Sequence, residues 1–386
     1  MNPPRRLELE DGSLITYTDA QNLDEDIVTK LGYTEHRKKL YDNLDRQKDT
    51  IRSLVRHHLQ LPNDAECTVL PQEQWIKGSF NVCIPIRTVS GSTHRNLILR
   101  CCLPYKLAEA QYPGTIDEKL RCEVGAYAWM QQYCTDIRIP YLYGFGFTDN
   151  RHADEPAIDM LNDDLRERRY TESDREHRNI LIQRNVGDEE ECREGMAMRT
   201  LLRGLSYKYI KKEFRNGPFC LQFTDLHASN IFVDEDWNVT CLLDLEWISA
   251  LPVEMLAVPY WLTNRKIDEV AKEHFEEFNQ VRQQFMRIFE EEEVKADSDT
   301  ALSRVMQDTW NSKAFWFWHC LESVDAMSWL MRDQICPQFG TSWAPSMSKM
   351  LSKFWCEDSQ EMVDKKMNEL KVYEEELRDA LKANRP

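Results

Sequence analysis

Three side chains that could serve phosphoryl transfer follow one another in the stretch FTDLHASNIFVDEDWNVTCLLDLEW, residues 223–247. Asp225 is followed five residues later by Asn230, and Asp244 comes near the end of the stretch. Carboxylate, amide and phosphate oxygens are ligands that Mg²⁺ favours. In phosphoryl transfer, an acid in a loop orients the attacking hydroxyl while an Asn and a second Asp bind the metal. The pattern therefore predicts Asp225 as the catalytic base and Asn230 and Asp244 as metal ligands.

A β-hairpin is predicted to bring these side chains together. Apolar runs at 231–233 and 239–243 flank a polar turn at 234–238, which is a good hairpin pattern. Asn230 and Asp244 are equidistant from the tip, so pairing of the two arms would bring both to its open end. The alternative for each residue alone is a turn cap or a strand flank, but the combination favours a site.

The two remaining acids of the stretch are expected to have a structural role only. Asp234 and Asp236 fall at the predicted tip of the hairpin. Short polar side chains of this kind favour turns because they form hydrogen bonds with nearby backbone. We expect both to turn the chain and to stay solvated.

A buried carboxylate is predicted upstream of the hairpin. In the helical pattern of residues 116–134, Glu123 falls inside the apolar face. A carboxylate there is costly unless it is paired. Arg100, at the end of the strand-like run NLILR, is the natural partner, and in kinases such a cation pairs with a helix Glu and holds the ATP phosphates. The alternative is that Glu123 bends outward into solvent.

The hairpin residues carry a resemblance to a known family. The segment TDLHASNIFVD with LLDLEW resembles the catalytic loop and metal-binding segment of the aminoglycoside phosphotransferase and choline kinase-like family. It is similar to the fungal "phosphotransferase enzyme family" members, and the likeness extends over residues 75–262. The resemblance implies a two-lobed protein kinase-like fold and ATP-dependent phosphorylation of a small-molecule hydroxyl, with ATP and Mg²⁺ as cofactors. It gives Asp225, Asn230 and Asp244 the same roles as above.

The same resemblance extends to a candidate phosphate-covering loop. The run WIKGSFNVCIPI has one glycine, Gly78, which is a weaker signal than G-x-G-x-x-G. In the family's abbreviated loop, the backbone N–H groups of Ser79, Phe80 and Asn81 would face phosphate. Without the resemblance, an ordinary hairpin turn is the better interpretation.

Departures from the family pattern motivate a second hypothesis. Phe223 stands where the family has His, Arg100 stands where it has Lys, and Asp244 is followed by Leu-Glu rather than Phe-Gly. The only candidate for the adenine-binding hinge strand is Asn179–Gln183, NILIQ. The leading hypothesis is a small-molecule kinase. The alternative is a pseudokinase, in which the same fold serves binding or scaffolding without turnover. A purely structural helical protein would require the 223–247 pattern to be accidental.

The elements that must position these residues predict an α+β chain with a small β-rich N-lobe and a larger, mainly helical C-lobe. Residues 1–65 form an N-terminal extension with one amphipathic helix at 35–60, and residues 66–147 form the β-rich nucleotide-binding lobe. Residues 148–190 are a charged linker or divergent hinge region. Residues 191–386 form the helical lobe with the catalytic loop and the acceptor pocket. Residues 302–334 are predicted to be helical, and Phe315 and Trp318 are expected to be core residues rather than pocket walls.

Composition excludes several classes of protein. The 386 residues carry a formal net charge of −17, which argues against a general nucleic-acid binder. No uncharged apolar stretch is long enough to cross a bilayer, so no membrane partner is expected. The 12 cysteines are sparse and lack metal-ligand spacing, which fits a reducing, cytoplasmic setting.

Overall fold

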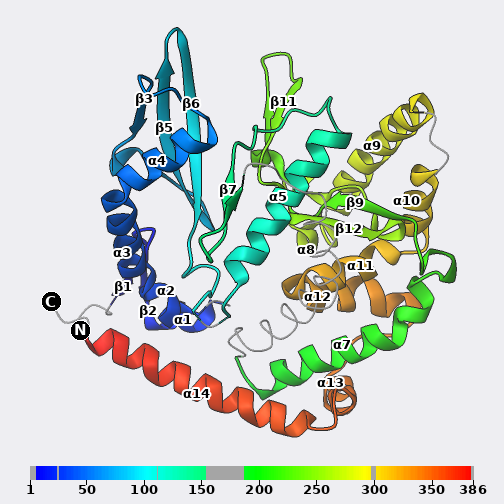
Figure 1. Cartoon of the computed structure of the whole chain (residues 1–386). Coiled ribbons are helices and arrows are strands. Elements are labelled where there is room, and N and C mark those ends of the chain that lie inside the picture. The colour runs from blue at the N-terminus through cyan, green and yellow to red at the C-terminus, as the bar shows by residue number, and fades with distance from the viewer. Residues whose placement is uncertain (1–5, 24–25, 111, 154–186, 297–300, 384–386) are drawn as a thin grey trace. The chain divides into compact units, whose positions relative to one another are not determined.

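The computed structural model describes residues 6–23, 26–110, 112–153, 187–296 and 301–383 (Figure 1). The chain is mixed α+β and divides into two compact units, neither of which is one continuous stretch. Unit 1 comprises Met1–Ser173, Val233–Glu246 and Glu375–Pro386, and unit 2 comprises Asp174–Phe232 and Trp247–Glu374. Within the described ranges, no helix has both the length and the apolar character that crossing a membrane requires.

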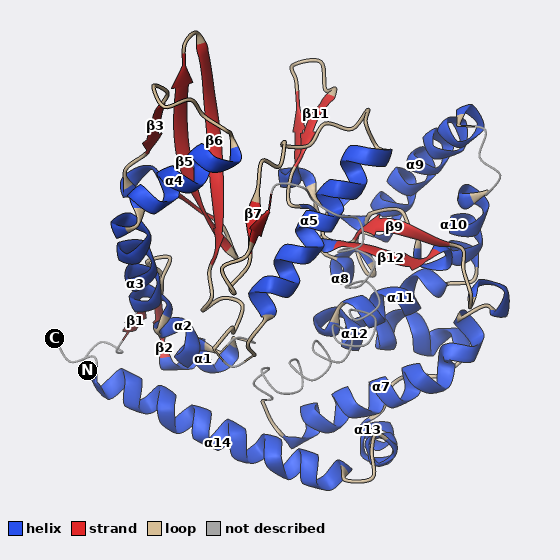
Figure 2. Ribbon diagram, in the orientation of Figure 1, coloured by secondary structure: helices blue, strands red, loops and turns tan. Residues whose placement is uncertain are grey.

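The main sheet of unit 1 is antiparallel and is built around one long strand, β5 (Asn81–Ser90). β6 (Thr93–Cys102) pairs along one edge of β5 (Figure 2). The other edge is shared by β3 (Glu66–Val69) and β4 (Ile76–Lys77). The short strands that the sequence predicts after residue 66 are thus present.

One face of this sheet is packed against helix α4 (Lys48–His58). Alternate residues of β5 are buried, as the period of two in a strand requires. Cys83 and Arg100 are directly opposite each other on β5 and β6, so their side chains share the other face of the sheet. The buried residues of the packed face are Ile51, Val55, Val69, Trp75, Val82, Ile84, Ile86 and Leu103.

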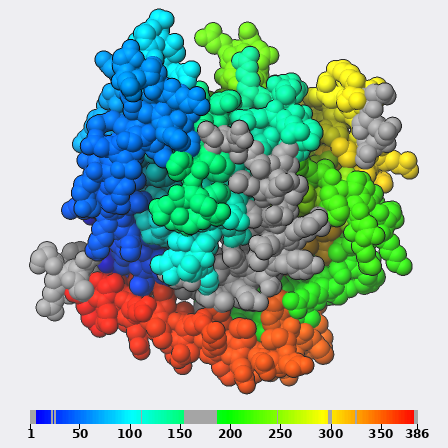
Figure 3. All heavy atoms as spheres, viewed as in Figure 1, coloured from blue at the N-terminus to red at the C-terminus, as the bar shows by residue number. Residues whose placement is uncertain are grey.

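The single helix predicted at 35–60 is wrong, because two helices occupy this region. α3 (Tyr33–Arg46) and α4 are separated at Gln47, whose φ of −95° and ψ of 15° are not helical. Between Leu44 and Ile51 the sequence is entirely polar, so no burial holds a straight helix through this stretch. The side chains of Leu44 and Ile51, on either side of this stretch, nevertheless pack on the same core cluster. The two helices form an outer surface of unit 1, in blue in Figure 3.

A buried carboxylate ties the N-terminal segment to the rest of unit 1. Glu10 lies 2.9 Å from Lys77 Nζ on β4 and 3.1 Å from Lys106 Nζ. Tyr105 donates its hydroxyl to the same carboxylate at 3.2 Å. Burial acts to raise the pKa of Glu10, but hydrogen bonds and charge from the two lysines hold the pKa below its usual value.

The remaining elements of unit 1 include the helix that carries Glu123. They are β1 (Arg6–Glu8), β2 (Leu14–Thr16), α1 (Tyr17–Asn22), α2 (Ile27–Leu31), α5 (Thr115–Tyr133), β7 (Phe145–Gly146), β8 (His152–Ala153) and β11 (Val239–Leu242).

Unit 2 is mainly helical, with one antiparallel strand pair formed by β9 (Phe219–Phe223) and β12 (Ile248–Pro252). Its helices are α7 (Glu189–Tyr209), α8 (Ile267–Val270), α9 (Phe275–Lys295), α10 (Leu302–Asn311), α11 (Ala314–Glu322), α12 (Val324–Leu330) and α13 (Pro345–Leu351). Helix α14 (Ser359–Ala383) begins in unit 2 and ends in residues assigned to unit 1.

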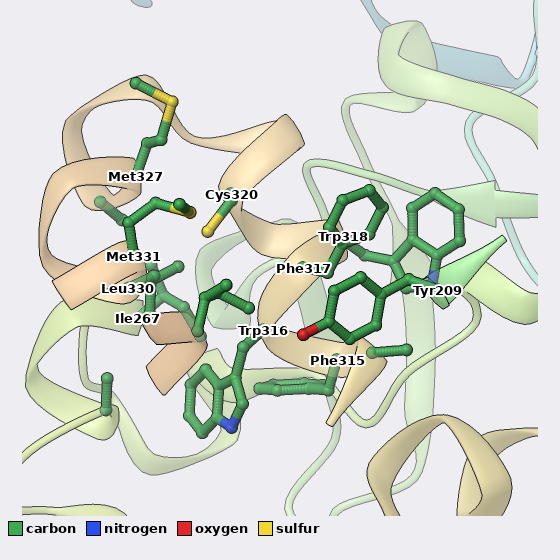
Figure 4. Packing of buried hydrophobic residues seen from close by; sticks show 14 of the residues in the cluster. Tyr209, Ile267, Phe315, Trp316, Phe317, Trp318, Cys320, Met327, Leu330 and Met331 are labelled. Carbon is green, nitrogen blue, oxygen red and sulfur yellow. The ribbon is translucent and has the colours of Figure 1, made fainter. Parts of the chain in front are cut away.

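The aromatic run of α11 lies in the core of unit 2, as predicted. Phe315, Trp316 and Trp318 are at most 6% exposed and pack with neighbouring buried residues (Figure 4). The helical character predicted for 302–334 is confirmed, but the stretch is divided into separate helices. The chain breaks at Lys313, where φ is 64°, and Ser323 then caps α12 by accepting a hydrogen bond from the N–H of Ala326.

The predicted hairpin is present: β10 (Ile231–Val233) and β11 form a two-stranded sheet. At its tip, the Asp234 carboxylate accepts hydrogen bonds from the backbone N–H groups of Asp236 at 3.0 Å and Asn238 at 2.9 Å. These bonds, with those from the Asn238 side chain, lower the pKa of Asp234. The structural role predicted for Asp234 is therefore confirmed, and Asp236 is exposed beside it.

Most of the predicted linker at 148–190, including the hinge candidate Asn179–Gln183, lies outside the described residues.

The close approach of Gly144 to His58 provides a test of packing in unit 1. A Cβ at Gly144 would lie 2.6 Å from His58 Nδ1, and this ring also packs against His57 and His152. We expect Gly144→Ala to lower the free energy of unfolding by about 1–3 kcal/mol, because overpacking forces neighbours to shift. Urea unfolding measures the change.

The matched control is Gly204→Ala in α7, where an added Cβ meets nothing within 4 Å. This substitution should raise the free energy of unfolding by about 0.5–1 kcal/mol, because alanine is a better helix former than glycine. Equal effects of the two substitutions would contradict the role given to the contact with His58.

Candidate functional site

The predicted ion pair between Arg100 and Glu123 is present in unit 1. Arg100 Nη1 lies 2.8 Å from Glu123 Oε1, joining the end of β6 to the middle of α5. Arg100 Nη2 also lies 2.8 Å from Asp244 Oδ1. One guanidinium therefore bridges two of the predicted site carboxylates, a geometry that suits its planar fork.

Lys119 is a fourth charged member of this group, and the sequence reasoning missed it. Its side chain is 6% exposed, and Nζ lies 3.6 Å from Glu123 Oε2. Nζ also donates to Asn81 Oδ1 at 3.4 Å. The signal was available in the sequence, since Lys119 precedes Glu123 by one helical turn, the i,i+4 spacing at which side chains meet.

The start of α5 is fixed by another carboxylate. Glu109 accepts hydrogen bonds from the backbone N–H groups of Gly114 at 2.7 Å and Ile116 at 2.9 Å, which are unsatisfied donors at a helix N-terminus. Gly114 has a φ of 102°, a conformation that suits glycine. Burial acts to raise the pKa of Glu109, but these hydrogen bonds hold it below its usual value. The direction of α5, and with it the position of Glu123, is set here.

Asp244 has an unusual backbone conformation. Its φ is 62°, in the left-handed region that residues other than glycine rarely adopt. Leu242, two residues earlier, donates its backbone N–H to the Arg138 carbonyl at 2.9 Å. Strained conformations of this kind cluster at functional sites. Here the strain accompanies the contact between Asp244 and Arg100.

The candidate phosphate loop is the turn between β4 and β5. The Gly78 N–H donates to the Asn81 carbonyl at 2.8 Å, and residues 78–80 are exposed. The Asn81 side chain is buried, 7% exposed, against Lys119. The roles of Ser79, Phe80 and Asn81 toward phosphate stay predictions.

Burial is the main cause of the pKa shifts of two residues beside Arg100 and Glu123. Burial raises the pKa of the Cys83 thiol, and the charge of Arg100 opposes this. Burial and then the negative charge of Glu123 raise the pKa of Tyr127, one turn further along α5. Both groups remain protonated at neutral pH and add no charge beside Arg100.

In unit 2, the loop after β9 carries Asp225 and is held by backbone contacts. Phe223 pairs with Ile248 in the β9–β12 register. Thr224 donates its N–H and its hydroxyl to the Trp247 carbonyl, at 3.2 and 2.6 Å. The position at which the resembled family has an imidazole is thus part of a strand pair.

Asn230 is buried under this loop, 8% exposed, and ties it together. Its Nδ2 donates to the Asp225 carbonyl at 3.3 Å and lies 3.4 Å from His227 Nε2. Because an amide nitrogen only donates, His227 accepts at Nε2 and carries its proton on Nδ1, which lies 2.7 Å from Ser229 Oγ. His227 therefore serves hydrogen bonding in the loop. Asn230 keeps its amide oxygen, the atom that a cation would bind.

A cluster near Asp225 was not predicted from the sequence. Burial raises the pKa of Tyr260, and the charges of Glu322 and Asp225 raise it further. The Tyr260 ring lies edge-on to that of His319, with centroids 5.4 Å apart. His319 Nδ1 lies 2.7 Å from Glu322 Oε2. These residues come from separate parts of unit 2, so only the folded chain reveals the cluster.

The predicted metal ligands belong to different units, Asn230 to unit 2 and Asp244 to unit 1. Their convergence on one ion therefore stays a prediction. No group of three or more His, Cys, Asp and Glu side chains in the described ranges is placed to hold a metal ion. The predicted set is of another kind, with one amide and one carboxylate, and Mg²⁺ commonly takes its remaining ligands from water and substrate phosphates.

Comparison of the chain with protein-family models, with curated proteins and with solved structures found no match in any of the three.

The central position of Glu123 gives a testable prediction. Glu123→Gln leaves Lys119 buried without its carboxylate, and breaking a buried pair from one side is costly. We expect the free energy of unfolding to fall by about 3 kcal/mol, measured by urea denaturation.

Glu35→Gln is the matched control, because Glu35 and Lys39 are also an i,i+4 pair in unit 1 but are mostly exposed. It should leave the free energy of unfolding nearly unchanged, because a solvent-exposed ion pair contributes little to stability. A Glu123→Gln effect as small as that of the control would contradict the central role of Glu123.

Proposed function

We propose that this chain is a phosphotransferase with a two-lobed protein kinase-like fold, which transfers the γ-phosphoryl group of Mg-ATP to a hydroxyl of a small molecule. The observation that carries the proposal is the bridge from Glu123 through Arg100 to Asp244, with both contacts at 2.8 Å. A strand cation that is paired with a helix Glu and close to a metal-binding Asp is the arrangement that kinases use to hold phosphates.

Arg100 is the proposed phosphate ligand. Its side chain is 28% exposed, so its guanidinium is accessible to a ligand from solvent. Glu123 holds Nη1 and fixes the plane of the fork. Nη2, which now contacts Asp244, is suited to a phosphate oxygen because guanidinium binds phosphate through parallel N–H groups.

The residues present fit a bound magnesium ion by their chemistry. Asn230 offers an amide oxygen and Asp244 offers a carboxylate with one oxygen beyond the Arg100 contact. Both are hard oxygen donors. When bound, Mg²⁺ would neutralise charge on the phosphate oxygens. Asn230 and Asp244 are its proposed ligands.

Asp225 is the proposed catalytic base. Its exposed side chain stands in the loop between β9 and Asn230, and its own carbonyl is held by the Asn230 amide. The Asp225 carboxylate would accept the proton of the acceptor hydroxyl and orient that oxygen for attack. Burial and the charges of Glu322 and Asp225 raise the pKa of Tyr260, so Tyr260 and Asp225 are neighbours in unit 2.

The proposal covers the fold and the compartment as well. A unit built around an antiparallel sheet and a mainly helical unit support the assignment of two kinase-like lobes. All 12 cysteines are free thiols, which supports a reducing, cytoplasmic setting where Mg-ATP is abundant.

A pseudokinase is the alternative, and Phe223 is the observation that favours it. The family imidazole is replaced by a side chain that cannot form a hydrogen bond, although Thr224 holds the same loop through Trp247. In this alternative, Mg-ATP would bind without turnover.

Thermal melting tests whether the chain binds Mg-ATP. Mg-ATP should raise the melting temperature of the chain at millimolar concentration, because a ligand of the native state stabilises it by mass action. Arg100→Met should abolish the rise, since it removes the proposed phosphate ligand. Arg95→Met, an exposed arginine on the same strand, is the control and should keep it. Equal shifts in both variants would sink the assignment of Arg100.

A substitution at the proposed base tests whether the chain catalyses phosphoryl transfer. Asp225→Asn should keep the Mg-ATP melting shift and lower the rate of phosphoryl transfer by about 10²–10⁴-fold, the usual contribution of a general base. The measurement is ATP consumption over a panel of amino-alcohols, sugars and aminoglycosides. Asp236→Asn at the hairpin tip is the control and should be fully active. A wild-type chain that binds Mg-ATP but turns over no acceptor would support the pseudokinase.

A further inference from the structure

The turn between β4 and β5, residues 78–80, has backbone N–H groups that are available to a ligand. The three residues are exposed. The first N–H of the turn donates to the Asn81 carbonyl at 2.8 Å, and the Leu103 N–H donates to the Phe80 carbonyl at 2.8 Å. Within the described residues, the N–H groups of Ser79 and Phe80 donate to no protein acceptor. Successive N–H groups in a turn can form a concavity that binds anions.

Buried side chains anchor this turn at both ends. Lys77, the last residue of β4, precedes the turn, and its Nζ lies 2.9 Å from Glu10 Oε2. Asn81, the first residue of β5, follows the turn, and its side chain accepts a hydrogen bond from Lys119 Nζ at 3.4 Å. The side chains of Glu10 and Lys119 are each 6% exposed. An exposed turn is thus held between two buried charges.

Glu10 also reaches the chain that supports the far side of the turn. It belongs to the N-terminal segment, where it lies in the turn that joins β1 to β2. Besides its contact with β4, its carboxylate lies 3.1 Å from Lys106 Nζ and accepts the Tyr105 hydroxyl at 3.2 Å. Both residues closely follow Leu103, whose N–H holds the Phe80 carbonyl. One carboxylate therefore fixes β4 against the segment that supports the turn.

We propose that Glu10 is a positioning residue of the nucleotide site, which holds the β4–β5 turn in the conformation that presents the N–H groups of Ser79 and Phe80 to phosphate. The inference rests on the proposed binding of Mg-ATP. It makes the N-terminal segment a part of that site, although this segment lies outside residues 75–262, which carry the family resemblance. A turn that is ordered before binding loses less entropy when the ligand arrives.

The sign of the effect distinguishes positioning from simple electrostatics. A carboxylate repels phosphate, so removal of Glu10 would strengthen nucleotide binding if its charge alone mattered. If Glu10 positions the turn, its removal weakens binding. The cations around it can be solvated once the carboxylate is gone, because the side chains of Arg37, Lys77 and Lys106 are 31%, 33% and 21% exposed.

The test measures the dissociation constant of Mg-ATP by isothermal titration calorimetry. Glu10→Ala should raise it about 10-fold, the lower end of the loss seen when outer-shell partners of a metal site are removed. Asp11→Ala is the matched control and should bind like the wild type, because it removes an equal but exposed charge that forms hydrogen bonds with Ser13. Equal or tighter binding in Glu10→Ala would overturn the inference and leave the proposed function intact. A wild-type chain that binds no Mg-ATP would overturn both.

Substitutions at Lys77 keep the inference testable if Glu10→Ala does not fold. Lys77→Met breaks the same contact and should weaken Mg-ATP binding to a similar degree, whereas Lys77→Arg, which still pairs with Glu10, should retain it. In the nucleotide-free chain, hydrogen exchange followed by mass spectrometry should be faster for residues 76–82 in Glu10→Ala and Lys77→Met than in the wild type, and unchanged in Asp11→Ala. Unchanged exchange in the first two variants would show that the contact does not order the turn, and would refute the inference.

Discussion

The charge of Glu123 has to be neutralised inside unit 1, and the arrangement of that unit depends on how this is done. An ionised carboxylate in the interior is tolerated only when cations and hydrogen bonds replace its lost water. Arg100 and Lys119 meet this need from two sides, one from β6 and one from the preceding turn of α5. Each cation has a second partner, Asp244 and Asn81, so the same charge orders the segment after β11 and the end of the candidate phosphate loop.

The features that could be predicted from the sequence are those that depend on residues close together along the chain. The alternation in β5, the hairpin turn at Asp234 and the core character of α11 are local or periodic patterns, and the structure contains them. The pairing of Arg100 with Glu123 was predictable because a carboxylate on an apolar face needs a cation. The i,i+4 spacing of Lys119 and Glu123 was visible in the sequence, but lysine is almost always exposed, and only the folded unit shows that Lys119 is buried.

The two helix breaks that the sequence did not predict have a common physical origin. Periodicity records which side chains are buried, but it does not record where the axis of a helix changes direction. At Gln47 the chain bends within a polar stretch, and at Lys313 it adopts a positive φ within a stretch that keeps a helical pattern on both sides. In both places apolar residues before and after the break pack on one core. The loop of Asp225 illustrates a related point, since it is held by hydrogen bonds from the Thr224 N–H and hydroxyl to the Trp247 carbonyl and not by an imidazole at position 223.

The division of unit 1 into separate stretches of sequence has a consequence for how the protein is made. Arg100 and Asp244 are 144 positions apart, so a ribosome releases the cation long before the acid that faces it. Until then, Glu123 is the only one of its two acidic partners that Arg100 can contact, because the segment of unit 2 that precedes β11 is still being synthesised. Contacts between such distant segments form slowly, because a long loop must close first. The ionic group is therefore completed late, only after the first segment of unit 2, Asp174–Phe232, has been synthesised.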